Sequence, residues 1–157
     1  MSALDIGQQA PDFTAETTQG TVSLSDLLAA SSRGVVVYFY PKASTPGCTK
    51  EACDFRDSLE AWAAAGYAVV GISPDSPEAL ARFARKQSLP FPLLSDTDHR
   101  VMEAWGAWGE KKSYGRTSTG VIRSTVVVGP DGAVRLARYN VRATGHVERL
   151  RKELGID

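Results

Sequence analysis

The sequence is short of the residues that hold metal ions and structural disulfides. Its 157 residues include two cysteines and two histidines, His99 and His146. A closed zinc site takes four ligands, usually cysteine and histidine in tightly spaced pairs, and the two histidines lie far from both cysteines in the sequence. His99 stands in a polar stretch and His146 opens an amphipathic helix, so we expect both to be solvated surface side chains. We therefore expect no metal site and no other cofactor.

Charge of one sign and long apolar runs are also lacking. Eighteen basic and eighteen acidic side chains give a formal net charge of zero, without the clustered basic face that nucleic-acid binding requires. The longest apolar run, residues 35–40, is far too short to span a bilayer. The N-terminus shows no basic region followed by an apolar stretch, the pattern of a secretory signal. These features predict a cytoplasmic protein with neither a nucleic-acid nor a membrane partner.

What the sequence does contain is the alternation of strand-like and helix-like segments that is typical of an α/β layer fold. The length suits one domain, residues 1–157, and we expect a central sheet with helices on both faces. We expect a looser segment between residue 105 and the hairpin near the C-terminus. The expected strands are residues 34–41, 67–74 and 91–96 and a hairpin over 121–139, and the expected helices are residues 46–60, one starting at 77, a short one near 99–105, and a last one from about 144 to 155.

Both cysteines lie near the start of the first long helix. Thr45 suits the N-cap, and Pro46 suits the first helical position, where its missing N–H costs nothing. Cys48 then falls in the first turn, where unpaired N–H groups and the helix dipole favour an anion such as a thiolate. The Thr45 hydroxyl can interact with a nearby oxygen or sulfur, and Pro41 would shield the pocket from one side. We expect Cys53 to lie deeper, in apolar surroundings.

The spacing of the cysteines argues against a structural disulfide. Positions i and i+5 of an α-helix have Cα atoms ~8.7 Å apart, whereas a disulfide needs roughly 4.4 to 6.8 Å. A bond between Cys48 and Cys53 therefore requires the helix to unwind. The pair is for this reason poorly suited to a permanent structural disulfide but suited to a reversible redox switch. A peroxide oxidises a thiolate to a sulfenic acid, which a second thiol condenses to a disulfide. In a reducing compartment the pattern favours a reactive pair, with Cys48 peroxidatic and Cys53 resolving.

At these residues the chain resembles the peroxiredoxins, and among them the bacterioferritin-comigratory or peroxiredoxin Q subfamily. Pro41, Thr45 and Cys48 match the signature Pro-x-x-x-Thr-x-x-Cys, and Cys53 matches the subfamily's resolving cysteine. Similar stretches continue along the chain, namely "GQQAPDFTA", "LSDTDHRVMEAWGAWGEKK" and "GVIRSTVVVGPDG". Members often carry "PKDNTPGC", whereas this chain has Ala-Ser at positions 43–44, outside the signature. We expect this departure to affect the rigidity of the loop or substrate access but not the chemistry.

The resemblance implies a thioredoxin-like fold with an added N-terminal hairpin. It also implies an arginine that holds the reactive thiolate, and the position of Arg123 within "IRSTVVV" matches that residue. Glu51, three residues after Cys48, could orient the guanidinium. The implied activity is reduction of hydrogen peroxide and organic hydroperoxides by a monomeric thiol-dependent peroxidase that thioredoxin regenerates.

Two other functions share the same cysteines. A thiol–disulfide oxidoreductase would act on protein disulfides, but this activity normally uses Cys-x-x-Cys, and four residues separate the cysteines here. A redox sensor or holdase would need the cysteines without fast turnover. Peroxide consumption coupled to thioredoxin distinguishes the three functions.

Overall fold

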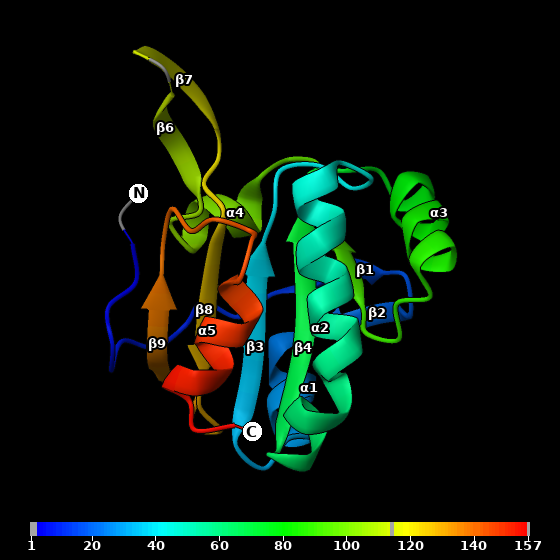
Figure 1. Cartoon of the computed structure of the whole chain (residues 1–157). Coiled ribbons are helices and arrows are strands. Elements are labelled where there is room, and N and C mark those ends of the chain that lie inside the picture. The colour runs from blue at the N-terminus through cyan, green and yellow to red at the C-terminus, as the bar shows by residue number, and fades with distance from the viewer. Residues whose placement is uncertain (1–2, 114, 157) are drawn as a thin grey trace.

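A mixed sheet organises the computed structural model, which describes residues 3–113 and 115–156 (Figure 1). Its strands are β1 (Thr14–Thr17), β2 (Gly20–Ser23), β3 (Gly34–Phe39), β4 (Tyr67–Ser73), β5 (Leu93–Ser95), β8 (Ser124–Val128) and β9 (Val134–Arg138). They lie in the order β2-β1-β5-β4-β3-β8-β9. Strand β4 runs parallel to both β3 and β5, whereas β8 runs antiparallel to β3. The N-terminal pair β1–β2 and the pair β8–β9 are antiparallel, as expected of hairpins.

Helices cover both faces of this sheet, which confirms the expected α/β architecture (Figure 1). They are α1 (Leu24–Ala29), α2 (Pro46–Ala64), α3 (Pro77–Gln87), α4 (Arg100–Ala104) and α5 (His146–Glu153). All six residues of β3 are buried, and successive side chains of a strand point to opposite faces. Val36 and Tyr38 therefore belong to the core beneath α2, α3 and α5, whereas Val35 and Val37 belong to the core beneath α1 and α4.

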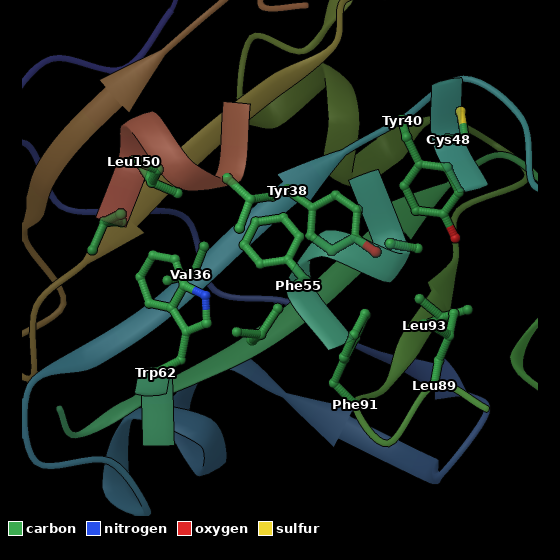
Figure 2. Packing of buried hydrophobic residues seen from close by; sticks show 14 of the residues in the cluster. Val36, Tyr38, Tyr40, Cys48, Phe55, Trp62, Leu89, Phe91, Leu93 and Leu150 are labelled. Carbon is green, nitrogen blue, oxygen red and sulfur yellow. The ribbon is translucent and has the colours of Figure 1, made fainter. Parts of the chain in front are cut away.

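Aromatic stacking fixes the middle of α2 to the sheet. Phe55 is fully buried, and its ring centroid lies 4.6 Å from that of Tyr38 (Figure 2). The Tyr38 ring in turn lies against β4, where a Cβ added at Gly71 would come within 2.8 Å of it. Gly71 thus provides the space for the stack. Trp62 packs against Phe55 from two turns further along the same face of the helix, so α2 is held at its centre and toward its C-terminal end.

The segment expected to be looser forms a second sheet. Strands β6 (Trp108–Ser113) and β7 (Arg116–Val121) pair antiparallel and extend from the body of the protein (Figure 1). The expectation was wrong here because the strands are mainly polar and lack the alternating apolar pattern of a half-buried strand. At the base of this hairpin the Trp108 ring stacks on His99, with centroids 3.6 Å apart. Helix α1, only six residues long, was also not predicted.

Within the described part of the chain, no helix is both long and apolar enough to cross a membrane.

Candidate active site

The loop between β3 and α2 carries the signature residues. Pro41 follows the end of β3 and is half-buried, and Thr45 occupies the N-cap of α2 with extended backbone angles. The Thr45 side chain makes no cap hydrogen bond. Its hydroxyl instead donates to the carbonyl oxygen of Lys42 at 2.8 Å, which closes the loop on itself. The N-cap position is confirmed, and the hydroxyl has an oxygen partner.

Asp75, which follows the end of β4, also holds this loop. The Asp75 carboxylate accepts a hydrogen bond from the Ala43 backbone N–H at 2.7 Å and another from the Ser73 hydroxyl at 2.8 Å. Strands β3 and β4 are parallel, so their carboxyl ends lie at the same edge of the sheet, where α/β folds commonly place functional groups. Sequence analysis did not identify Asp75, because the contact spans 32 positions and no local pattern marks it.

Cys48 lies in the first turn of α2 and is almost fully buried, with 1% of its surface exposed. The first helical backbone bond runs from the Thr49 N–H to the Thr45 carbonyl at 2.8 Å. Cys48 therefore lies among the N–H groups that have no partner within the helix, at the positive end of the helix dipole. The structure thus places Cys48 in the first turn of α2, as the sequence predicted.

Arg123 reaches Cys48 from across the fold. Its Nη2 donates to the Cys48 Sγ at 3.2 Å, and its Nη1 donates to the Glu51 Oε1 at 2.6 Å. The register of the sheet explains the meeting, because Ser124, the next residue, pairs with Phe39 at the end of β3. The planar fork of the guanidinium presents its two nitrogens to a sulfur and a carboxylate at once. The residues named from the motif and the resemblance, Cys48 and Arg123, are thus in direct contact.

The ion pair of Arg123 and Glu51 is largely buried. Glu51 is fully buried, and burial raises the pKa of its carboxyl to about 7, although Arg123 opposes this shift. Burial alone would lower the pKa of Arg123, but the negative charges of Glu51 and Cys48 raise it, so the guanidinium stays charged. Among the described residues, the second carboxylate oxygen of Glu51 has no hydrogen-bond partner. Glu51 therefore interacts with the site through a single oxygen.

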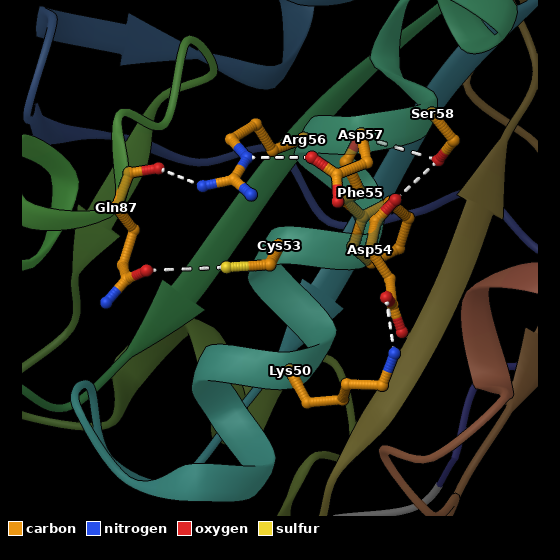
Figure 3. A network of polar contacts seen from close by, with 8 residues as sticks. All are labelled: Lys50, Cys53, Asp54, Phe55, Arg56, Asp57, Ser58 and Gln87. Atoms are coloured by element: carbon orange, nitrogen blue, oxygen red, sulfur yellow. Dashed lines mark hydrogen bonds and ion pairs between the residues drawn. The ribbon is translucent and has the colours of Figure 1, made fainter.

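Cys53 is not in the deep apolar position that the sequence suggested. It is half-buried on the edge of α2 that faces α3, and its Sγ lies 3.4 Å from the Gln87 Oε1 (Figure 3). The buried stripe of α2 passes beside it, through Ala52 and Phe55. Both cysteines are free thiols. Cys53 and Cys48 lie on one helix that is continuous from Pro46 to Ala64, as expected.

The expectation of solvated histidines was wrong for His146. This side chain is 4% exposed, and its Nε2 lies 2.7 Å from the Thr125 hydroxyl on β8. Burial, with the nearby charges of Arg149 and Arg123, lowers the pKa of His146 to about 4. The sequence identified the start of a helix but not that β8 packs against it. Within residues 3–113 and 115–156, no three histidine, cysteine or acidic side chains form a group suited to a metal ion.

Known proteins are similar to this chain in sequence and in fold. Residues 6–137 match the model of the AhpC/TSA family. A putative peroxiredoxin of Mycobacterium tuberculosis is 58% identical over 151 residues, which cover 96% of this chain and 94% of that protein. Peroxiredoxin Bcp of Bacillus subtilis is 43% identical over 145 residues, covering 92% and 90% of the two chains.

Solved structures agree with these relatives. The bacterioferritin comigratory protein of Xanthomonas campestris superposes with a TM-score of 0.83 at 33% identity, covering 99% of this chain and 98% of that one. A PrxQ variant of Xylella fastidiosa superposes with a TM-score of 0.88 at 30% identity, covering 99% and 98%. The fold is therefore the thioredoxin-like fold of the peroxiredoxins, and the N-terminal hairpin is present as β1–β2. This chain belongs to the AhpC/TSA family and, within it, to the Bcp or PrxQ peroxiredoxins, which are peroxidases.

Proposed function

We propose that this peroxidase reduces hydrogen peroxide and organic hydroperoxides through Cys48, that Cys53 forms a disulfide with the oxidised Cys48, and that thioredoxin or a similar dithiol reduces that disulfide. The observation that carries the proposal is the 3.2 Å contact between the Arg123 Nη2 and the Cys48 Sγ at the start of α2. The related protein of X. campestris has alkyl peroxide reduction activity, which supports organic hydroperoxides as substrates of this enzyme.

The first step is attack of the Cys48 thiolate on a peroxide oxygen. The O–O bond breaks as an S–O bond forms, so the sulfur is oxidised to a sulfenic acid and the peroxide is reduced. The departing oxygen takes up the proton that the thiol had released and leaves as water or an alcohol. Arg123 stabilises both the thiolate and the negative charge that develops on the peroxide oxygens, because its charge and its donors are already in place. Thr45 and Pro41 shape the loop beside the sulfur.

The second step is attack of Cys53 on the sulfenic sulfur of Cys48. An S–S bond forms and the S–O bond breaks, and the hydroxyl group leaves with the proton of the Cys53 thiol as water. Positions five residues apart on an intact helix have Cα atoms ~8.7 Å apart, beyond the disulfide range of roughly 4.4 to 6.8 Å. The first turns of α2 must therefore unwind. An external dithiol then attacks the disulfide and restores both thiols while it is itself oxidised.

We further propose that the enzyme works as a monomer in a reducing compartment such as the cytoplasm. Among the described residues, Ile6 is the only large hydrophobic side chain that is exposed, at 70%. Obligate interfaces bury extended apolar patches, so a single exposed isoleucine supports a monomer. Two free cysteines that undergo a catalytic cycle also fit a compartment in which thioredoxin is kept reduced.

Consumption of NADPH in the presence of thioredoxin, thioredoxin reductase and peroxide tests the proposal. We expect multiple turnovers with hydrogen peroxide and with an alkyl hydroperoxide. A protein that reduced protein disulfides but not peroxides would instead be a thiol–disulfide oxidoreductase. A single stoichiometric oxidation without turnover would indicate a redox sensor and would contradict the proposal.

A further inference from the structure

Two side chains of α2 hold one residue of α3. Cys53 contacts the side chain of Gln87, with 3.4 Å between Sγ and Oε1, and Arg56 donates from Nη1 to the Gln87 backbone carbonyl at 2.6 Å (Figure 3). Cys53 and Arg56 are three residues apart, so they project from the same face of the helix. Gln87 is the last residue of α3. The resolving sulfur is thus attached to a second helix by a contact that the peroxidatic site does not include.

The Arg56 contact makes this attachment point well defined. The last carbonyls of a helix lack intrahelical partners and carry the negative end of its dipole, so a guanidinium there is favourable. Arg56 is itself held by Asp57, with 2.9 Å between Nε and the carboxylate. Gln87 is therefore fixed relative to α2 through its backbone, and its side chain is left to bind Cys53.

The chemistry of the Cys53 contact opposes its role as a nucleophile. Gln87 Oε1 is an acceptor, so the Cys53 sulfur must keep its proton to donate to it. A thiolate, not a thiol, attacks a sulfenic acid. The hydrogen bond therefore has to break before the Cys53 sulfur can act as the nucleophile.

The packing of α2 shows where the helix can open. Phe55 is fully buried and stacks on Tyr38, and Arg56 remains bonded to α3. Unwinding from Pro46 through Cys53 would release Cys53 from Gln87 while leaving Phe55 and Arg56 in place. The Cys53–Gln87 contact, like those of Cys48 and Glu51 with Arg123, belongs to the segment that must open before the two sulfurs can meet.

We infer that Gln87 is a positioning residue for the resolving cysteine, a latch that holds the Cys53 sulfur against α3 and delays disulfide formation. This inference rests on the proposed role of Cys53. The latch sets how long the Cys48 sulfenic acid persists, and a longer lifetime lets a second peroxide oxidise it to the sulfinic acid. Gln87 therefore affects sensitivity to over-oxidation without touching the peroxide site.

Rapid-quench measurements on Gln87→Leu test the latch. Intact-mass analysis at each time point follows the sulfenic acid and the Cys48–Cys53 disulfide separately. Loss of one weak hydrogen bond should make disulfide formation about two- to five-fold faster, with an unchanged rate of Cys48 oxidation. The peroxide concentration that gives half-maximal over-oxidation should rise by a similar factor. Gln87→Glu keeps an acceptor oxygen, so its disulfide should form at the wild-type rate or more slowly.

Lys86→Leu is the matched control, because it places the same side chain at an exposed neighbouring position of α3. It should leave both rates unchanged. Gln87→Met, which keeps the unbranched chain, repeats the measurement if the leucine variant proves unstable. An unchanged or slower disulfide step in Gln87→Leu, or in Gln87→Met where it replaces that variant, would overturn the latch alone. Absence of any Cys48–Cys53 disulfide in the wild type would overturn the resolving role of Cys53 and the latch with it.

Discussion

The Arg123 guanidinium contacts a thiol and a buried carboxylate with one planar group, so the ionisation of Glu51 bears directly on the reactive sulfur. When Glu51 is ionised, its charge-assisted bond holds Nη1 in place and orients Nη2 toward Cys48. When Glu51 takes up a proton, that bond weakens and the guanidinium is held less firmly. With the pKa of Glu51 raised to about 7 by burial, this change falls near neutral pH.

Glu51→Gln should therefore change the pH profile of peroxide reduction. Glutamine resembles the protonated carboxyl at every pH, so the variant should match the wild type near pH 5.5 and react about tenfold more slowly near pH 8.5. Stopped-flow oxidation of Cys48 by hydrogen peroxide measures both rates. Arg123→Ala serves as the comparison and should be slow at all pH values. If the ratio of the Glu51→Gln oxidation rate to the wild-type rate stayed constant between pH 5.5 and pH 8.5, Glu51 would act only through packing.

His146 predicts a separate pH effect, on stability. The pKa of His146 is lowered from 6.5 to about 4 in the fold, because burial disfavours the imidazolium and Arg149 and Arg123 repel it. The unfolded chain then binds more protons than the folded one between these values, so stability is complete above pH 6.5 and is lost as pH falls toward 4. The loss should reach about 3 kcal/mol at pH 4. Urea unfolding of His146→Gln should lack this component, and identical pH slopes in the two proteins would contradict the assignment.

For single residues, the sequence predicted the features that depend on neighbouring positions in the chain. The helix start and its Thr45 N-cap depend on neighbouring residues, and so does the position of Cys48 in the first turn. Arg123 was identified only through the family resemblance, because the strand register that brings it to the sulfur is a property of the fold. The partner of Cys53, Gln87, lies 34 positions away and has no sequence signal.

Helix α2 is the element that the proposed cycle changes. Its centre and C-terminal part are held by Phe55 and Trp62, both fully buried, whereas its first two turns contact Arg123 through Cys48 and Glu51. Oxidation of Cys48 alters those contacts at one end of the helix and leaves the aromatic contacts at the other. Local unfolding confined to the start of α2 follows from this uneven distribution.

Hydrogen exchange of the reduced and disulfide forms measures the unwinding directly. Amides between Cys48 and Cys53 should exchange about tenfold faster or more in the disulfide form. Amides after Phe55 should keep their protection, because the stack on Tyr38 is unaffected. Equal protection of residues 48–53 in the two redox states would show that the disulfide forms without unwinding.

Hydrophobic periodicity predicted some of the helices and strands and missed others. The long buried strand β3 and the amphipathic helix α3 carry strong patterns, and both were predicted. The β6–β7 hairpin was not, because its strands pair mainly with each other and have little core to face. The six-residue helix α1 is too short for a helical period to show.

Across the whole molecule, the sheet brings the reactive groups together. The carboxyl ends of β3 and β4 supply the Cys48 loop and Asp75, and the antiparallel β8 brings Arg123 to the same edge. Residues that are 75 positions apart therefore meet at one sulfur. Sequence analysis predicted the α/β class from alternation and the resemblance implied a thioredoxin-like fold, but the strand order that creates this meeting came from the structure.

The proposed cycle depends on Cys48, and not Cys53, reacting with peroxide. One equivalent of hydrogen peroxide added to Cys53→Ser, followed by dimedone and peptide mass mapping, tests it most directly. We expect a dimedone adduct on Cys48 in this variant, a Cys48–Cys53 disulfide in the wild type, and no peroxide consumption by Cys48→Ser. A dimedone adduct on Cys53 in the wild type, or continued peroxide reduction by Cys48→Ser, would contradict it.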